Sequence, residues 1–380
     1  MSGAVPEVSV VMPCLNEEAT VGTCVRQALA AMARSGLSGE VVVADNGSTD
    51  ASAELAAAAG ACVVAAPVRG YGAAYSAGLA AARGRYLVLG DADGTYDFDR
   101  VPDFVLKLRE GNDLVLGSRF AGQILPGAMP WLHRYVGNPV LTGILGIFFG
   151  RRVSDAHCGM RALTREAYDG MRLRTTGMEF ASEMVAMALR QELRVAEIPI
   201  VYHPRTGESK LRSFRDGWRH LRFMLLLSPT PLFILPGFAA ILFGASALAA
   251  LLPGPLHFGG MKFDFHFMFV ASALVILGMQ LVVLGLAAKT HARAELRVGD
   301  RWLVFLDRWF TLERGLLAGL VLFAGGVGID VMILVDWIGA GLGALFAVRP
   351  ALVGLTLLVV GAQLVFGSFL ISILRDDARS

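Results

Sequence analysis

The sequence has few cysteines, and their spacing contains no metal or disulfide motif. The 380 residues include four cysteines and no CxxC pair, at positions Cys14, Cys24, Cys62 and Cys158. A zinc site or a disulfide framework is therefore not expected, and each cysteine is interpreted as a small core residue. Reduced cysteines suit a cytosolic location for the N-terminal half.

A strong charge of one sign is also absent. The formal net charge is only +2, so nothing in the overall balance indicates a nucleic-acid partner. Residues 1–7 contain no basic region followed by an apolar stretch, so a cleaved signal peptide is not expected.

Long hydrophobic runs, by contrast, are abundant in the second half of the chain. Hydrophobic residues make up 55% of the sequence, which is too many for one ordinary soluble domain. A membrane-crossing helix needs about 20 apolar residues. Four runs meet this requirement, and they predict membrane spans near 231–252, 266–288, 315–337 and 350–374.

The basic residues between the second and third runs predict an orientation. This segment, 289–314, is rich in lysine and arginine: Lys289, Arg293, Arg297, Arg301, Arg308 and Arg314. The segments after the first and third runs hold little beyond Lys262 and Arg349. The positive-inside rule therefore places segment 289–314, the N-terminal half and the tail 375–380 in the cytoplasm.

A helix along the membrane surface is predicted just before the first run. Five apolar residues recur at helical spacing on one face: Leu211, Phe214, Trp218, Leu221 and Leu225. The neighbouring face carries Arg212, Arg215, Arg219 and Arg222. This pattern suits the headgroup plane, although an ordinary surface helix can share it. The expected domains are a globular domain at 1–210, an interfacial helix at 211–228 and a four-helix membrane domain at 229–380.

The first 200 residues alternate short β-branched runs with alanine-rich helical stretches. The alternation predicts an α/β fold whose mostly parallel, Rossmann-like sheet carries helices on both faces. Ligands of such sheets bind beyond the carboxyl ends of the strands. Strands are expected at 8–12, 41–45, 61–66, 86–90 and 113–117, with helices such as 18–34 and 73–82 between them.

Polar motifs follow the first two predicted strands. Pro13-Cys14-Leu15-Asn16-Glu17-Glu18 follows the first, and Asp45-Asn46-Gly47-Ser48-Thr49-Asp50 follows the second. Glu17 and Asp45 have carboxylates that can accept hydrogen bonds from a base edge or a ribose. A turn followed by a helix N-cap is the alternative interpretation of 46–50.

Two aspartates follow the fourth predicted strand, in Gly90-Asp91-Ala92-Asp93-Gly94. In an extended chain their side chains point to the same face about 6.6 Å apart. Two carboxylates so placed can share a divalent cation, which neutralises a diphosphate. A polar turn is the alternative, and a lone DxD is a common pattern.

A dinucleotide fold is the competing interpretation of Arg69-Gly70-Tyr71-Gly72, which opens a helix about twenty residues before Asp91. The third glycine of that fingerprint would fall at Tyr75, however, and the motif follows the third strand rather than the first. A nicotinamide cofactor is therefore disfavoured.

Basic residues gather in the later part of the globular half. They are Arg119, Arg134, Arg161 and the run Arg205-Thr206-Gly207-Glu208-Ser209-Lys210, which abuts the predicted interfacial helix. Arginine forks match phosphate oxygens, and the last run is expected at the height of lipid phosphates. Solvated surface charge is the alternative for any one of them.

Taken in order, these motifs resemble the family 2 glycosyltransferases of GT-A fold, and within them the polyprenyl-phosphate (dolichol-phosphate mannosyltransferase-like) branch. The resemblance covers residues 8–215. It rests on Pro13-x-x-Asn16-Glu17, Asp45-Asn46-Gly47-Ser48-Thr49-Asp50, Arg69-Gly70-x-Gly72, Asp91-x-Asp93, Gly117-Ser118-Arg119, Ser154-Asp155-x-x-Cys158-Gly159-x-Arg161 and Arg205-x-Gly207-x-Ser209-Lys210.

The resemblance implies an inverting enzyme that moves a hexose from a UDP- or GDP-linked nucleotide sugar to a polyprenyl phosphate lipid. It also implies a catalytic domain on the cytoplasmic side of the plasma membrane, and Mg²⁺ or Mn²⁺ bound by Asp91 and Asp93. The implied nucleotide-binding residues are Pro13, Asn16, Glu17, Asp45, Asn46, Arg69 and Asp91. The implied catalytic residues are Asp93, Arg119, Asp155 and Arg161, and the implied lipid-phosphate-binding residues are Arg134, Arg205, Ser209 and Lys210.

Two positions depart from the family pattern. Thr95 stands where many relatives have a glutamine that helps to bind the metal, which leaves the third protein ligand open. Cys158 replaces the usual serine before Gly159, which weakens the expectation of a hydroxyl contact with the sugar there.

The implied chemistry depends on electrostatics more than on a base. A lipid monophosphate is already an anionic oxygen nucleophile, and the difficulty is to bring it against a negatively charged sugar nucleotide. A metal on the leaving diphosphate and fixed cations on the attacking phosphate meet this need. Asp155 is a candidate for orienting Arg161 or the incoming phosphate. Glu179 and Glu183, on a helix expected near 178–191, are candidates for sugar hydroxyl contacts, with plain helix surface as the alternative.

Two other functions stay open at this point. A processive polysaccharide synthase shares the fold and the membrane helices, but such enzymes usually carry a QxxRW motif, which this sequence lacks. A non-catalytic lipid transporter or scaffold is the other, and the intact Asp91, Asp93, Arg119 and Lys210 argue against it. The sequence does not fix the sugar, the nucleotide, the lipid length or the oligomeric state, and a homo-oligomer is compatible with it.

Overall fold

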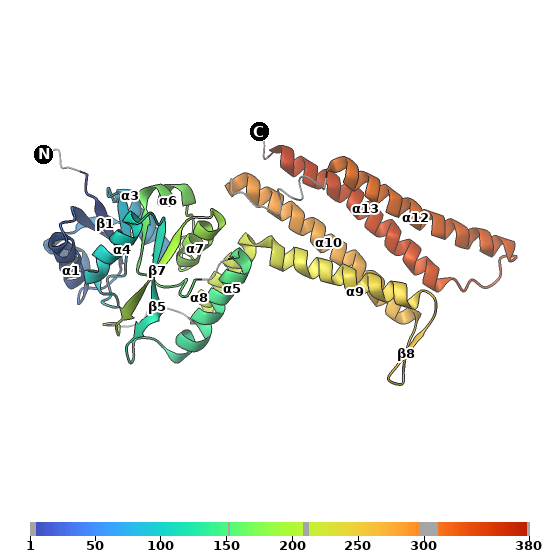
Figure 1. Cartoon of the computed structure of the whole chain (residues 1–380), viewed down its shortest axis with the longest axis horizontal. Helices are drawn as coiled ribbons and strands as arrows, with labels where there is room; N and C mark the ends of the chain where they lie inside the picture. The colour runs from blue at the N-terminus through green and yellow to red at the C-terminus, as the bar shows by residue number, and fades with distance from the viewer. Residues whose placement is uncertain (1–4, 151–152, 208–212, 297–310, 378–380) are drawn as a thin grey trace. The chain divides into compact units, whose positions relative to one another are not determined.

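The computed structural model of the protein describes residues 5–150, 153–207, 213–296 and 311–377. The chain divides into two compact units, Met1–Met224 and Leu225–Ser380. Figure 1 shows the first unit as a sheet flanked by helices and the second as a group of long helices.

The first unit is built on a seven-stranded sheet in the order β3-β2-β1-β4-β6-β5-β7. Its strands are β1 (Val8–Cys14), β2 (Gly39–Asp45), β3 (Cys62–Ala65), β4 (Tyr86–Leu89), β5 (Leu114–Ile124), β6 (Arg161–Thr164) and β7 (Val195–Tyr202). β1 pairs in parallel with β2 and β4, and β5 pairs in parallel with β7. β6 runs antiparallel between β4 and β5. The mostly parallel sheet predicted from the sequence is confirmed.

Helices pack on both faces of β1. Val10 and Val11 of β1 are consecutive and both are 0% exposed, which requires cover on both sides because successive side chains point to opposite faces. Val10 belongs to the core formed with α1, whereas a Cβ added at Gly78 of α3 would lie 2.5 Å from Val11. The helices of this unit are α1 (Val21–Arg34), α2 (Ser52–Ala58), α3 (Tyr71–Ala81), α4 (Val101–Arg109), α5 (Asn138–Phe149), α6 (Arg165–Met171), α7 (Phe180–Arg190) and α8 (Ser213–Leu227).

Two strands escape the sequence pattern. β6 has only four residues, and its apolar side chains are too few to show a period. β7 buries Ile198 and Ile200 but leaves Val201 38% exposed, so its run resembles a surface strand. β5 also continues to Ile124, past its expected end, because β7 pairs with it beyond a register shift between Ser118 and Gln123.

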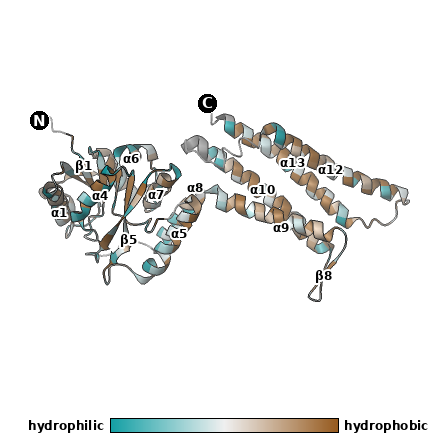
Figure 2. Ribbon diagram, viewed as in Figure 1, coloured by the Kyte–Doolittle hydropathy of each residue, from teal (hydrophilic) through white to brown (hydrophobic). Residues whose placement is uncertain are grey.

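The second unit contains the four long apolar helices that the sequence predicts. The helices that are long and apolar enough to cross a membrane are Thr230–Leu251, Phe265–His291, Leu312–Gly339 and Val348–Arg375. They lie within α9 (Leu235–Leu251) and the turn before it, α10 (Phe265–Leu296), α12 (Leu312–Gly339) and α13 (Val348–Asp377). Figure 2 shows that hydrophobic residues predominate in these helices. The protein is therefore a multi-pass membrane protein.

Glycines allow the membrane helices to approach one another closely. α9 packs on α10, α10 on α13 and α13 on α12. A Cβ on Gly237, Gly319 or Gly326 would lie 2.7–2.8 Å from a backbone carbonyl oxygen of the neighbouring helix, that of Gly278, Gly361 and Gly354 respectively. Small residues at such contacts stabilise helix pairs in lipid through close van der Waals packing.

A short hairpin, β8 (Leu256–Phe258) and β9 (Met261–Phe263), connects α9 to α10. Asp264 follows it and accepts hydrogen bonds from the Phe265 N–H at 2.8 Å and from Arg349, at the start of α13, at 2.6 Å. This ion pair ties the beginning of α10 to that of α13.

Candidate active site

The carboxyl ends of β1, β2 and β4 meet at one edge of the sheet. Cys14, the last residue of β1, pairs with Asp45, the last residue of β2, and β4 pairs with β1 on its other side. Pro13, which precedes Cys14, is half-buried at the same edge. The loops that follow these strands therefore lie next to one another, as expected for a ligand site of a parallel sheet.

The loops after β1 and β2 are locked together by hydrogen bonds. The Asn16 side-chain oxygen accepts a hydrogen bond from the Thr49 N–H at 2.8 Å, and the Asn16 N–H donates to the Ser48 hydroxyl at 3.0 Å. The Asp45 carboxylate accepts hydrogen bonds from the N–H groups of Ser48, at 3.1 Å, and Gly47, at 3.3 Å. Asn16 has a φ of 52°, a left-handed conformation that asparagine tolerates. Asn16 and Asp45 thus shape the rim of the site.

Asn46 braces a third segment of chain, between β3 and α3. It is 6% exposed, and its amide donates hydrogen bonds to the carbonyl oxygens of Ala66, at 2.9 Å, and Val68, at 2.7 Å. Its side-chain oxygen accepts one from the Gly70 N–H at 2.9 Å. These bonds position the exposed Arg69, so Asn46 acts here on the backbone that carries Arg69.

Asp91 and Asp93 lie beside each other in a largely buried position. The Tyr75 hydroxyl donates a hydrogen bond to Asp91 Oδ1 at 3.1 Å, and burial together with the charge of Asp93 raises the pKa of Asp91 to about 7. Asp93 is 7% exposed, and its Oδ1 accepts hydrogen bonds from the Thr95 N–H, at 3.1 Å, and the Thr95 hydroxyl, at 2.6 Å. A side chain at Gly159 would collide with this pair, because its Cβ would lie 2.7 Å from Asp91 Oδ2.

The Arg205 guanidinium reaches two of the acidic loops. It donates a hydrogen bond to Glu17 Oε1, and its Nη1 lies 3.4 Å from Asp93 Oδ2. Arg205 is 188 residues from Glu17 in the sequence. The fold therefore brings a residue expected to bind phosphate against a residue expected to bind metal.

The paired aspartates fit a divalent cation such as Mg²⁺ or Mn²⁺. Hard cations prefer carboxylate oxygens, and a buried acid whose pKa is raised by a neighbouring acid gains from a positive charge between the two. Among the described residues, no group of three or more His, Cys, Asp or Glu side chains has the spacing to hold a metal. Thr95 donates its hydroxyl hydrogen to Asp93, so it orients a candidate ligand.

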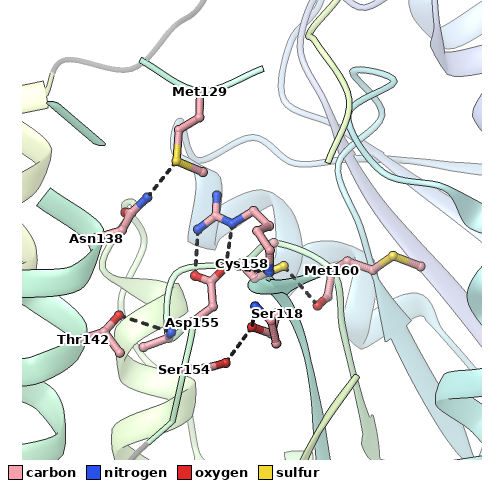
Figure 3. A network of polar contacts seen from close by, with 12 residues as sticks. Ser118, Met129, Asn138, Thr142, Ser154, Asp155, Cys158 and Met160 are labelled. Carbon is pink, nitrogen blue, oxygen red and sulfur yellow. Dashed lines mark hydrogen bonds and ion pairs between the residues drawn. The ribbon is translucent and has the colours of Figure 1, made fainter. Parts of the chain in front are cut away.

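Arg119 and Asp155 form a buried ion pair. Figure 3 shows the Asp155 carboxylate with its contacts as dashed lines. Arg119 Nε and Nη2 donate to the two carboxylate oxygens at 2.7 and 2.8 Å, and the Arg119 backbone N–H donates to Oδ2 at 3.1 Å. The Tyr202 ring covers the guanidinium, with its centroid 5.1 Å from Cζ. Asp155 was expected to orient Arg161 or the incoming phosphate, and in the structure it binds Arg119.

Arg161 points into the protein. It is 2% exposed and donates hydrogen bonds to the backbone carbonyls of Cys158 and Ala181, the latter at 2.9 Å. The guanidinium therefore holds the loop before β6 against α7. Cys158 is fully buried, and burial raises its pKa to about 12, which agrees with its expected role as a core residue.

The two glutamates of α7 differ in their surroundings. Glu183 is 6% exposed, and its carboxylate accepts hydrogen bonds from the N–H groups of Arg174 and Thr175, both at 2.9 Å, and from the Thr175 hydroxyl at 2.6 Å. It caps the 174–175 segment. Glu179 lies just before the first residue of α7 and is half-buried.

A histidine pair, which the sequence pattern does not reveal, joins the 153–160 loop to α8; His220 is buried and His157 is half-buried. The Ser182 hydroxyl lies 2.7 Å from His220 Nδ1 and 3.4 Å from His157 Nδ1, and the two rings meet edge to face. Burial lowers the pKa of His220 to about 4 and that of His157 well below its ordinary value. Both rings are therefore neutral at pH 7. Single histidines in separate segments give no sequence signal.

An exposed apolar segment surrounds Arg134. Trp131 is 67% exposed and Ile147 of α5 is 78% exposed, whereas the only buried residues of α5 are Thr142 and Leu145. The stretch from 131 to 149 is largely apolar in the sequence, but His133, Arg134 and Asn138 interrupt it. α5 itself has only 12 residues, fewer than the about 20 that a membrane span needs. Two further residues expected to bind lipid phosphate, Ser209 and Lys210, lie outside the described residues.

Comparisons with known proteins show which family the chain belongs to. Residues 9–171 match the model of glycosyl transferase family 2, and residues 285–375 match the glycosyltransferase family 2 C-terminal transmembrane region. The chain is 42% identical to the low-salt glycan biosynthesis hexosyltransferase Agl6 of Haloferax volcanii, over 99% of this chain and 91% of that protein.

Further relatives are named for lipid phosphates. The dolichyl-phosphate hexose transferase of Haloferax volcanii is 34% identical over 56% of this chain and 89% of its own length. The undecaprenyl-phosphate 4-deoxy-4-formamido-L-arabinose transferase of Klebsiella pneumoniae is 29% identical over 80% of this chain and 94% of its own.

Glucosyl-3-phosphoglycerate synthase from Mycobacterium tuberculosis, solved with Mn²⁺ and UDP-glucose, is 26% identical over 58% of this chain and 78% of that one, with a TM-score of 0.46. Because the match to Agl6 spans nearly the whole chain, the protein belongs to glycosyltransferase family 2 and is a glycosyltransferase with a C-terminal membrane domain.

Proposed function

We propose that the protein transfers a hexose from a UDP- or GDP-linked sugar to a polyprenyl phosphate and releases the nucleoside diphosphate. The observation that carries this proposal is the meeting of Arg205 with Glu17 and Asp93. A cation suited to a phosphate, from the segment that leads to the first membrane helix, lies at the carboxylates suited to a metal–diphosphate complex.

The donor subsite is assigned to the loops after β1, β2 and β4. Pro13, Glu17, Asp45 and Arg69 border it, and Asn16 and Asn46 fix the loops that carry them. Asp91 and Asp93 would hold Mg²⁺ or Mn²⁺, which supplies positive charge to the diphosphate as it leaves. Water and donor oxygens are the natural remaining ligands for such an ion.

The acceptor subsite is assigned to basic groups near the membrane. Arg205 and Arg134, together with Ser209 and Lys210, would bind the lipid phosphate, since guanidinium forks match phosphate oxygens. The Arg119–Asp155 pair would hold the loop beneath them. A phosphate oxygen then attacks the anomeric carbon from the face opposite the diphosphate, the carbon–oxygen bond to the diphosphate breaks, and the configuration inverts. No base is needed, because the attacking oxygen is already anionic.

Two elements are suited to contact the bilayer. On α8, Trp218 is 58% exposed and Arg215, Arg219 and Arg222 are exposed, while His220 is buried against the domain. The exposed apolar residues of α5 form a second such surface. An apolar and basic helix surface lies stably in the headgroup plane. We place the catalytic unit on the cytoplasmic side of the plasma membrane on the strength of the positive-inside rule.

The decisive test is a panel of labelled UDP- and GDP-hexoses with undecaprenyl phosphate and dolichyl phosphate in vesicles. One nucleotide sugar is expected to yield metal-dependent label that extracts into organic solvent and is released by mild acid. Label in a water-soluble polymer would favour a processive polysaccharide synthase. Donor hydrolysis without lipid-linked label from any member of the panel would exclude the proposed acceptor.

A further inference from the structure

The donor site already contains a positive group of the protein itself, the Arg205 guanidinium. The Arg205 side chain is 23% exposed and lies between the carboxylates of Glu17 and Asp93, each of which is 10% exposed as a side chain. At such low exposure an ion pair is screened only weakly by solvent. Arg205 therefore neutralises two acids that would otherwise repel each other.

Asp93 has one oxygen available for a second partner. Its Oδ1 accepts hydrogen bonds from both the N–H and the hydroxyl of Thr95, at 3.1 and 2.6 Å. Its Oδ2 is the oxygen that faces Arg205 Nη1 at 3.4 Å. A metal ion bound by Asp93 would use Oδ2, because Oδ1 is held by two donors. The metal and the Arg205 guanidinium thus compete for the same atom.

The segment around Arg205 covers the same loops. The Thr206 hydroxyl oxygen would lie 4.0 Å from a Cβ on Gly94, which directly follows Asp93. Thr206 and Gly207 also line a cavity with residues 16–19 and Asp50. Gly207 has a φ of +100°, a conformation that other residues rarely adopt. Displacement of Arg205 would therefore move residues 205–207 away from the rim of the donor site.

We infer that Arg205 is a displaceable internal cation: the divalent ion of the metal–donor complex replaces it at Asp93, and the released guanidinium then binds the acceptor phosphate. A divalent ion wins because its attraction to the carboxylates is twice that of a monovalent group at equal distance. The consequence is an order of binding, with the donor complex first and the lipid phosphate second. This inference rests on the proposed function only for the identity of the acceptor.

The competition is testable by measuring Mn²⁺ binding to the purified full-length protein in nanodiscs, without nucleotide or lipid phosphate. Electron paramagnetic resonance of free Mn²⁺ gives the dissociation constant. Arg205→Lys keeps the charge but loses the fork that reaches both acids. The variant is expected to bind Mn²⁺ about fivefold more tightly, because this is the size of effect that the loss of one partly exposed ion pair produces.

Arg205→Lys separates displacement from simple electrostatics. The positive charge is retained in this variant, so electrostatics alone predicts an unchanged dissociation constant for Mn²⁺, whereas displacement predicts a lower one. Arg34→Ala, which breaks the exposed Arg34–Asp99 pair, is the matched control and is expected to leave the constant unchanged. Thermal unfolding checks that each variant is folded.

Unchanged or weaker Mn²⁺ binding in Arg205→Lys would overturn the inference. Because the measurement contains no sugar and no lipid, this failure is distinct from a failure to transfer sugar to a polyprenyl phosphate. Steady-state kinetics adds a second readout: the lipid phosphate is expected to bind only after the donor complex. Lipid phosphate that protects Arg205 from an arginine-modifying reagent without metal and donor would contradict that order.

Discussion

Arg119 at the end of the buried part of β5 and Asp155 in the loop before β6 form a two-pronged ion pair, with side chains that are 7% and 0% exposed. The pair joins segments 36 residues apart and lies where phosphate-binding groups were expected. A guanidinium held at both prongs by one carboxylate is a fixed structural element. We propose that it contributes to catalysis through the shape of the loop that it holds.

Breaking this pair is expected to destabilise the catalytic unit. Asp155→Ala leaves the Arg119 charge buried without a partner, which costs ~3–5 kcal/mol. Thermal unfolding of the full chain in detergent, followed by tryptophan fluorescence, measures the loss. Arg34→Ala at an exposed pair is the control and should change stability by less than ~1 kcal/mol. Equal stability of the two variants would contradict the structural role of the pair.

Removing one carboxylate of the aspartate pair is expected to abolish most transfer without unfolding the protein. Asp93→Asn should lower the rate of lipid labelling by ~10²–10³-fold, the cost of losing one strong electrostatic contact in a transition state. Asp99→Asn, at an exposed pair outside the site, is the control. Chelation of divalent ions should stop the wild-type reaction, and added Mn²⁺ or Mg²⁺ should restore it. Wild-type rates from Asp93→Asn would remove this residue from the mechanism.

The histidine pair is expected to make stability depend on pH. Burial lowers the pKa of His220 to about 4 from the ordinary 6.5, against the opposing effect of Glu179 and Asp216. Between these two values the unfolded chain binds a proton that the folded protein does not, so stability should rise with pH from about 4 to 6.5. Thermal unfolding across this range measures the slope. His220→Asn, which retains a hydrogen-bonding group but does not titrate, should reduce the slope, and an unchanged slope would exclude His220 as its source.

Glycine packing in the membrane domain gives a matched pair of substitutions on one helix. A Cβ on Gly326 of α12 would lie 2.7 Å from the Gly354 carbonyl oxygen, whereas nothing lies within 4 Å of a Cβ on Gly328. Gly326→Ala is therefore expected to cost ~1–3 kcal/mol, as overpacking does, and Gly328→Ala is not. Denaturation of each variant in detergent, followed by the helical signal in circular dichroism, compares their free energies of unfolding. Equal effects would show that α12 and α13 do not pack through Gly326.

Several site residues could be found from the sequence because local physics places them. Asp45 and Asp91 follow apolar runs whose period marks them as strands, and the carboxyl ends of parallel strands share an edge. The four membrane helices follow from run length alone, since every backbone group must be satisfied inside the bilayer. These features depend on residues within a few positions of one another.

Contacts between distant segments could be identified only from the tertiary structure. The sequence marks Arg119, Arg161 and Arg205 alike as phosphate-binding candidates, yet the fold pairs the first with Asp155, turns the second onto backbone carbonyls and sets the third between Glu17 and Asp93. An arginine side chain is long and its direction is set by the groups that surround it after packing, so residue type and spacing cannot distinguish these three fates. Composition and periodicity determined the sheet, the carboxylates at its edge and the membrane helices, and packing alone decided which charges meet.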